Sequence, residues 1–379
     1  MKNGKRVARK NGAGNGPSDA SKIPKTRGGR RTGTPRAEKK AKSKTPRILL
    51  GSLCGLLLIG AAVLAYLFWP QAPDQPRPPN IVPPSLPPEQ RTPRPSGMTP
   101  SPDEILQEAE FNPNVHLILG AANFDGGNTD TIMLGALNYK ENTLHVLSIP
   151  RDTVIQYNGR QRRINTIFSL GEQNKRGSGM ETLAMELYKL LGIHSGNTVY
   201  IRANAFTRAV NAVGGVEFDV PINMYKPYEN IDLKRGQQRL YGAEALMLLR
   251  YRGYGRNNQA GVSHDDYGRM EMQQRFLKEA ARQILTVGNI PKIPEFVNIF
   301  NENVATTLTT NNISWFANEM TKVPNENIHF HTLPTQTNIV NGAYYEYIKV
   351  EEALEILQYI NPYTMPITRE MLRIDYAAQ

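Results

Sequence analysis

The chain has 379 residues, a net charge of +11 and a single cysteine, Cys54. Residues 1–47 hold 16 lysines and arginines against two acidic residues, whereas residues 48–379 sum to −3. The high isoelectric point therefore describes a tail, and it does not imply a folded nucleic-acid-binding domain. Because the only cysteine falls in an apolar segment, the rest of the chain has neither a disulfide nor a thiol nucleophile.

Residues 1–47 are too poor in large apolar side chains to bury a core, so we expect a disordered tail. Residues 48–69 carry no charge, and a helix of that length spans roughly 33 Å, enough to cross a bilayer. Basic residues precede this segment, and Trp69 and Pro70 close it. The positive-inside rule then predicts a single-pass plasma-membrane protein with a cytoplasmic N-terminus and an extracellular domain. A cleaved signal peptide and a buried core helix fit the length less well.

Residues 70–102 contain 13 of the 27 prolines, which predicts an extended, semi-rigid spacer. We assign residues 70–111 to this spacer and residues 112–379 to the extracellular domain. The basic tail is then expected to contact anionic lipid headgroups rather than a nucleic acid.

From about Asn112 onward the pattern predicts an α/β (or α+β) domain, built as a three-layer α-β-α sandwich around a central mixed sheet. Residues 115–119 predict a strand ending at Gly120, and residues 139–142 predict a turn. Leu183, Leu187 and Leu191 share one helical face that stops at Gly192. The other predicted elements are strands over residues 131–137, 143–149 and 216–220, and helices over residues 206–213, 241–249 and 269–285.

Several arginines stand where strands end or helices begin. Arg151 closes an apolar strand, and Arg250 and Arg252 project to the same side if that segment is extended. Arg269 opens a helix and shares a face with Gln273. Planar guanidiniums that converge suit a phosphate or pyrophosphate, because each donates two parallel hydrogen bonds. The alternative for any one of them is a surface ion pair.

Two further groups of residues carry oxygen or nitrogen atoms of the kind that bind metal ions. Asp130 precedes a strand, where a carboxylate suits Mg²⁺ bridged to phosphate oxygens, although a turn role is the alternative. His329 and His331 alternate on one predicted strand, but without a third ligand nearby we interpret them as a plain strand.

A set of motifs resembles the LytR–CpsA–Psr family. Residues 128–134 are similar to its Arg-Ser-Asp-Thr-Met-Met-Leu signature, and residues 147–152 match its Leu-Ser-Ile-Pro-Arg-Asp block. Residues 266–274 match its Asp-x-Gly-Arg…Gln-Gln motif. Residues 163–165, 213–221 and 236–252 resemble its other blocks, in the same order. The resemblance covers roughly residues 114–360 and includes the anchor-plus-spacer layout.

The resemblance implies a phosphotransferase that moves an anionic glycopolymer, such as a teichoic acid or capsule, from a polyprenyl pyrophosphate carrier to peptidoglycan. The family works with Mg²⁺ on an α/β fold whose apolar pocket holds the lipid tail. The implied catalytic residues are Arg151, Arg250, Arg252, Asp266 and Arg269, and the further substrate contacts are Arg163, Asn204 and Gln273. Asp130 would bind the metal, and Asp266 would support the arginines or assist proton transfer. Fixed cations stabilise the charge that spreads over a transferred phosphoryl group.

The sequence also departs from the family pattern. Ala122 and Phe124 replace the acid and the arginine after the first strand, Asn128 replaces an arginine, and Met272 stands where another often occurs. Asp125 is the candidate substitute for the lost metal ligand. The alternative is therefore a non-catalytic or pyrophosphatase-only member that binds the polyprenyl phosphate. A basic nucleic-acid-binding protein is a third hypothesis, and it rests on the tail alone.

Overall fold

The computed structural model describes residues 72–74, 101–124, 127–252, 266–284, 298 and 304–374, all within one compact unit, Ala62–Gln379. None of the helices in these ranges is long and apolar enough to cross a membrane. The predicted tail, the predicted membrane span over residues 48–69 and nearly all of the spacer before Ser101 lie outside the described residues. Those three assignments stay predictions.

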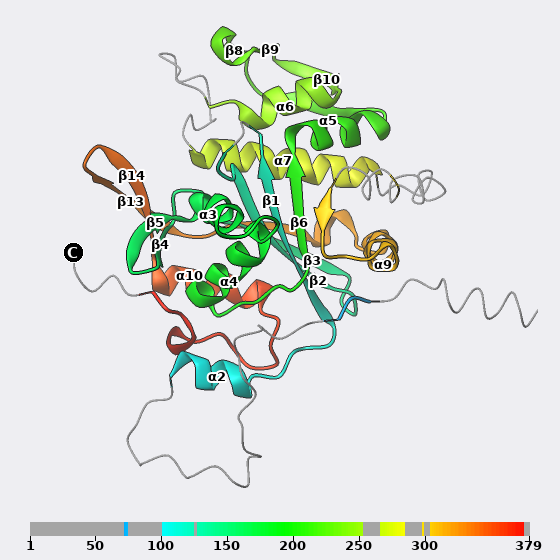
Figure 1. The fold of residues 1–379 in the computed structure, drawn as a ribbon. Helices are drawn as coiled ribbons and strands as arrows, with labels where there is room; N and C mark the ends of the chain where they lie inside the picture. Colours follow the sequence, from blue (N-terminus) through cyan, green and yellow to red (C-terminus); the bar gives the residue numbers. More distant parts are fainter. Residues whose placement is uncertain are drawn as a thin grey trace, which may run out of the picture. The chain divides into compact units, whose positions relative to one another are not determined.

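A six-stranded mixed sheet forms the centre of the domain, which confirms the predicted mixed α/β class (Figure 1). Three strands form an antiparallel meander because short turns join them. β6 and β12 join the meander in parallel on either side, and β11 pairs antiparallel with β6 at one edge. The order across the sheet is β11 (Ala305–Thr306), β6 (Thr198–Arg202), β1 (Val115–Asn123), β2 (Thr131–Asn138), β3 (Thr143–Ser148) and β12 (Ile328–Thr332).

Helices pack on both faces of this sheet because alternate strand residues point to opposite sides. On one face Leu117 and Leu119 belong to the main apolar core with residues of α3 (Ile167–Asn174), α4 (Gly179–Leu191) and α10 (Val350–Leu357). On the other face Ile118 and Leu137 belong to a cluster with Trp315 and Phe316 of α9 (Thr310–Met320). The helix α2 (Pro102–Glu108), with a capping box at Ser101, joins the first core through Leu106.

A third apolar cluster lies at the end of the sheet where β1 finishes. Figure 1 shows α7 running across this end beside α5 and α6. Gly242 lets α5 and α6 approach closely, because a Cβ there would overlap the backbone of Thr207. The elements of this region are α5 (Ala203–Ala212), β7 (Val216–Val220), β8 (Met224–Lys226), η3 (Pro227–Glu229), β9 (Ile231–Leu233), β10 (Gly236–Leu240), α6 (Gly242–Arg250) and α7 (Asp266–Ile284).

Two β-hairpins extend from the domain, and both turn through an Asn-Gly pair. In β4 (Val154–Tyr157) and β5 (Arg160–Arg163) the turn residues Asn158 and Gly159 have φ of 50° and 70°. In β13 (Thr335–Val340) and β14 (Ala343–Ile348) the turn has φ of 51° and 76°. These values suit the type I′ turn that matches strand twist. Short 3₁₀ helices complete the fold: η2 (Ile164–Thr166), η5 (Asn325–Asn327), η6 (Gln358–Ile360) and η7 (Arg369–Met371).

Two sequence-based boundaries were wrong. The first strand does not end at Gly120 but continues to Asn123, since Ala121 and Ala122 keep pairing with both neighbouring strands. The segment around Arg250 is not extended, because Arg250 is the last residue of α6. The two arginines therefore do not lie on one face of an extended strand, and only Tyr251 and Arg252 continue outside the helix.

Candidate active site

Two of the predicted arginines meet at Asp130, beside the start of β2. Nη1 of Arg151 lies 3.6 Å from Oδ1 of Asp130, and Nη2 of Arg269 donates to the Asp130 carbonyl at 3.3 Å. Arg151 follows β3, whereas Arg269 belongs to the first turn of α7, so strand ends and a helix start bring them together. They line a narrow crevice of about 10 Å³ with Ser148 and Gln273, which we call the arginine crevice.

Asp152 holds the arginines of this region in place. Its carboxylate lies 3.7 Å from Nε of Arg151 and 3.5 Å from Nη1 of Arg163, and the residue is 9% exposed. The Arg163 guanidinium also lies 5.1 Å from the ring centre of Tyr345. Partial burial strengthens these charge contacts relative to an exposed ion pair. Arg163 therefore stands at the margin of the crevice with its charge balanced by Asp152.

Gln273 and Gln274 of α7 join this helix to four other elements, β2, α6, β3 and β12. Gln273 is 2% exposed, accepts a hydrogen bond from the Thr131 hydroxyl at 3.1 Å and donates to the Leu249 carbonyl at 3.2 Å. Gln274 donates to the Ser148 hydroxyl at 2.9 Å and to the Thr332 hydroxyl at 3.1 Å. Neighbouring helical positions thus reach the starts and ends of different strands. Through these hydrogen bonds Gln273 and Gln274 hold α7 against the strand ends beside the crevice.

Leu249 links the end of α6 to Gln273, whereas Arg250 and Arg252 are not among the residues that line the crevice. Leu249 lies in the last turn of α6, where carbonyls lack partners within the helix, and Gln273 supplies one. Arg250 follows immediately, which brings the end of α6 next to Gln273 and β2. Among the described residues, the buried Nε–H of Arg252 has no hydrogen-bond acceptor. A buried donor of this kind costs about 1–3 kcal/mol unless a ligand satisfies it.

The remaining predicted site residues either lie away from the crevice lining or fall outside the described residues. Asn204 lies exposed in the first turn of α5, and its side chain accepts from the Ala205 backbone within the part of the chain described. Asp125 lies outside the described residues. Asp266 is the first residue of α7, one turn before Arg269, and its side chain is likewise outside the description. Their predicted roles stay predictions.

Sequence reasoning missed the contribution of the hairpin β13–β14. Glu346, which is 9% exposed, accepts hydrogen bonds from Thr335 at 2.6 Å and from the Tyr267 hydroxyl at 3.1 Å. Its backbone N–H donates to the Asp152 carbonyl at 2.9 Å. The base of the hairpin therefore connects Tyr267, near the start of α7, to Asp152, the residue after Arg151. The Asn-Gly turn between two alternating segments was the signal that could have revealed it.

An apolar cavity of about 710 Å³ lies between α3, α4 and β6. Its walls include Met180, Met185 and the rings of Phe168 and Tyr200, which stack at 4.2 Å. Arg202 also lines the cavity and ends β6, the strand that pairs with the end of β1. A volume in this range suits an extended apolar ligand or part of one. The lipid-tail pocket that the resemblance implied stays a prediction, and this cavity is the candidate for it among the described residues.

Glu172 adds a negative charge to the lining of this cavity. Hydrogen bonds from the backbone N–H groups of Gly177 and Gly179 lower the pKa of its carboxyl. The carboxylate is therefore ionised at neutral pH, and Arg176 and Arg202 lower its pKa further.

The replaced residues after β1 change the surroundings of Asp130. The ring of Phe124 packs 5.7 Å from that of Phe206, so it joins the apolar cluster of α5 and α7 instead of presenting a charge. Its backbone N–H donates to Oδ2 of Asp130 at 3.0 Å. Asp130 thus has one oxygen bound by the backbone and the other facing Arg151.

Asp130 by itself does not complete a magnesium site and would need water and phosphate oxygens as further ligands. Within the described ranges, no three His, Cys, Asp or Glu side chains are grouped to hold a metal. Mg²⁺ usually takes one or two carboxylates and completes an octahedral shell with water and substrate phosphates. The Asp130 carboxylate, which is 12% exposed, is able to serve as that single protein ligand.

Comparison with known proteins gives a family match. The model of the LytR_cpsA_psr family matches residues 104–361. The chain is 25% identical over 314 residues to a protein of Bacillus subtilis (strain 168) named polyisoprenyl-teichoic acid–peptidoglycan teichoic acid transferase TagU, covering 82% of this chain and 93% of the relative. It is 29% identical over 242 residues to the TagU of Oceanobacillus iheyensis, covering 62% and 71%.

Solved structures share the fold. The crystal structure of B. subtilis TagV aligns with a TM-score of 0.57 at 24% identity, covering 67% of this chain and all of that chain. A structure titled "TagT bound to LIIa-WTA" aligns with a TM-score of 0.54 at 19% identity, covering 68% and 94%.

Proposed function

Because the chain belongs to the LytR–CpsA–Psr family, we propose that it transfers an anionic glycopolymer from a polyprenyl pyrophosphate carrier to peptidoglycan. One observation carries the proposal: Arg151 and Arg269 converge on Asp130, and Gln273 brings the end of α6 to the same crevice. Relatives are named as teichoic acid–peptidoglycan transferases, which supports the donor and acceptor classes.

In this proposal the carrier's pyrophosphate lies on the arginine crevice and its apolar tail lies in the cavity between α3, α4 and β6. Arg151, Arg250, Arg252 and Arg269 neutralise the phosphate oxygens, and guanidinium forks orient them. The crevice is narrow, so the pyrophosphate would lie across its mouth. The buried Nε–H of Arg252 would gain an acceptor there.

The reaction is a phosphotransfer that balances without an oxidant or reductant. An acceptor sugar hydroxyl attacks the phosphorus that bears the polymer, and a new P–O bond forms. The bond from that phosphorus to the bridging oxygen breaks, and polyprenyl phosphate leaves with the electron pair. The hydroxyl proton is lost, for which Asp266 at the start of α7 is the proposed acceptor. The arginines stabilise the charge that spreads over the transferred group.

Magnesium is the proposed cofactor, with Asp130 as its protein ligand. When bound, it would neutralise charge on the phosphate oxygens. The residues of this chain orient the group in either case: Asp152 fixes Arg151, and Gln273 fixes the end of α6. We further propose a plasma-membrane anchor over residues 48–69, which keeps the domain on the outer face beside a lipid-linked donor.

The test uses the full chain in lipid vesicles with a polyprenyl-pyrophosphate-linked glycopolymer and peptidoglycan. We expect polymer on peptidoglycan and release of polyprenyl phosphate, both with added Mg²⁺. Absence of transfer and of carrier release would refute the proposal.

A second candidate is a member that only binds its lipid. It is favoured by Phe124, whose ring packs against Phe206 at the position where the family usually has an arginine. This alternative predicts tight binding of polyprenyl pyrophosphate without turnover or pyrophosphate hydrolysis, so any turnover that Arg250→Lys abolishes would remove it.

A further inference from the structure

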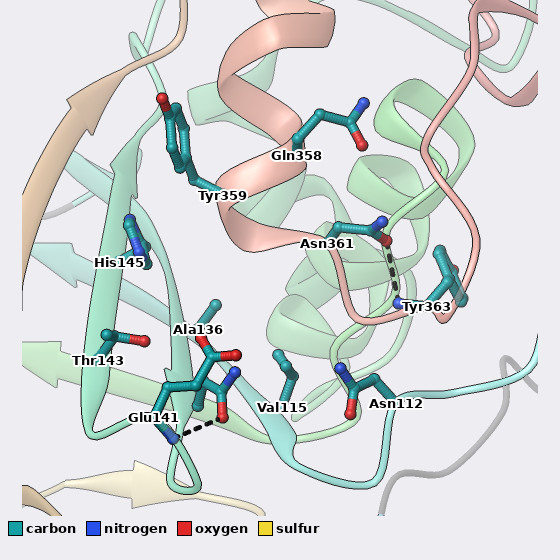
Figure 2. Close-up of a pocket in the computed structure, with 11 residues that line it drawn as sticks. Asn112, Val115, Ala136, Glu141, Thr143, His145, Gln358, Tyr359, Asn361 and Tyr363 are labelled. Carbon is teal, nitrogen blue, oxygen red and sulfur yellow. Dashed lines mark hydrogen bonds between the residues drawn. The ribbon is translucent and has the colours of Figure 1, made fainter.

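A second pocket, of about 320 Å³, lies at the far end of the meander from the arginine crevice, beside η6 (Figure 2). The strand β2 connects the two places, because Thr131 lines the crevice and Asn138 lines this pocket. Along β2 the crevice lining ends at Met133 and the pocket lining begins at Ala136, so the two places lie between about 10 and 23 Å apart along the strand. The pocket therefore belongs to neither the crevice nor the apolar cavity, and the proposed reaction leaves it without a role.

One wall of the pocket is an aromatic ring that is exposed yet held in place. Tyr359 is 55% exposed, and its ring stacks on His331 at 4.8 Å and 8° and on His145 at 5.3 Å and 16°. An exposed tyrosine normally turns freely about its side-chain bonds, whereas here two imidazoles support it. Figure 2 shows Tyr359 and His145 on one side of the pocket. The ring is a preformed platform for a flat, partly apolar ligand face.

The supporting histidines form a neutral pair. Nδ1 of His145 lies 3.0 Å from Nε2 of His331, which is one hydrogen bond between two imidazoles. Burial, His331 and His329 together lower the pKa of His145 to about 4. At neutral pH the platform thus rests on uncharged rings.

The part of the lining around the turn from β2 to β3 offers hydrogen-bonding groups that the fold leaves available. Asn138 accepts from the backbone N–H groups of Lys140 and Glu141 through Oδ1, and within the described residues its amide N–H₂ donates to none. The Thr143 hydroxyl and the Glu141 carboxylate also lack partners among the described residues. By contrast, Gln358 and Asn361 are engaged with the backbone around residues 354–367.

An aromatic platform in one pocket with an amide, a hydroxyl and a carboxylate matches the chemistry of a sugar ring. A pyranose presents C–H bonds on one face, which pack against an aromatic ring, and hydroxyls at its edge, which hydrogen-bond to amides and carboxylates. The pocket lining includes Glu141 and no lysine or arginine. This charge disfavours an anionic polymer and favours a neutral sugar. The volume suits one small ligand unit.

We propose that this pocket binds a neutral sugar unit of the acceptor glycan strand, at the other end of β2 from the arginine crevice. The proposal rests on the proposed function for the identity of the acceptor. The pocket would hold the strand while a distant sugar of the same strand receives the polymer, so Tyr359 is a specificity residue and not a catalytic one.

The test measures binding of the full chain, in detergent micelles, to peptidoglycan glycan strands freed of their stem peptides. We expect Tyr359→Ala to weaken strand binding at least tenfold, Thr143→Val to weaken it several-fold, and Tyr359→Phe to retain it. Tyr225→Ala is the matched control, because Tyr225 is 66% exposed on β8 and touches none of this pocket. Melting temperatures of all four variants show whether a loss of binding is a loss of fold.

Equal strand affinity in Tyr359→Ala and the unchanged chain would overturn the proposal. So would Tyr359-dependent binding of the anionic glycopolymer in place of the strand. Failure of the proposed function is separable: Arg250→Lys should bind strands normally, and that result supports the pocket even if no transfer occurs. Where transfer occurs, Tyr359→Ala should raise KM for the acceptor and leave kcat unchanged, whereas an unchanged KM would contradict the pocket.

Discussion

Replacing Gln273 by leucine should disturb the arginine crevice through position and not through charge. Gln273 is 2% exposed and makes two hydrogen bonds, one from Thr131 and one to the Leu249 carbonyl. Leucine keeps most of the volume but leaves the half-buried Thr131 hydroxyl and the helix-end carbonyl of Leu249 without this partner. At about 1–3 kcal/mol for each unsatisfied group, less what relaxation and water recover, we expect a loss of about 2–4 kcal/mol.

That loss corresponds to a fall in melting temperature of roughly 4–16 °C for a domain of this size. The functional effect is the sharper readout. Because Leu249 immediately precedes Arg250, its release should move the guanidinium and weaken polyprenyl pyrophosphate binding about tenfold or more. The assay pairs a thermal melt with an affinity measurement on the full chain.

Gln283→Leu provides the matched control on the same helix. Gln283 accepts from the Glu217 backbone N–H at 2.9 Å and donates to its carbonyl at 2.7 Å, about four turns away from Arg269 and next to β7. It should destabilise the domain to a comparable degree without changing the affinity. If Gln273→Leu lowers the melting temperature but binds the carrier as tightly as Gln283→Leu, Gln273 does not position Arg250.

Three further outcomes follow from the fold. Arg250→Lys and Arg252→Lys keep the charge but lose the fork, so each should weaken polyprenyl pyrophosphate binding at least tenfold with the melting temperature nearly unchanged; retained affinity in both would place them outside the site. Gly242→Ala should cost about 1–3 kcal/mol in a denaturant titration, because its Cβ overlaps Thr207, and a neutral result would contradict the close packing of α5 and α6. The pKa of His145, lowered from 6.5 to about 4, makes the unfolded chain bind more protons between those values; stability should therefore fall as pH drops from 6.5 to 4, and His145→Phe should flatten that part of the profile.

The sequence predicted what depends on neighbours along the chain. The strands around residues 115–148 and the helix stop at Gly192, with φ of 70°, followed from periodicity and glycine chemistry, and the structure confirms them. Gly120 was misread as a strand end because a glycine also fits inside a paired strand, where both neighbouring strands impose the conformation.

What the sequence left open depends on contacts between distant segments. His329 and His331 appeared as a plain strand, and His145 becomes their neighbour only because β12 pairs in parallel with β3. Likewise, the motif set named the arginines, but the supporting role of Glu346 depends on a hairpin that folds back onto Asp152. The sequence showed that Ala122 and Phe124 depart from the family pattern. It did not predict that Phe124 packs against Phe206.

The order of the strands in the sheet also governs when the crevice appears during biogenesis. The hydrogen bond between Thr131 and Gln273 joins residues 142 positions apart, and that between His145 and His331 joins residues 186 positions apart. Both contacts therefore form late in synthesis. The meander of β1, β2 and β3 requires only local contacts, whereas docking of α7 and β12 must overcome the entropy of long loops. We therefore expect an emerging chain to fold its meander first and to complete the arginine crevice only after residues beyond 332 have been synthesised.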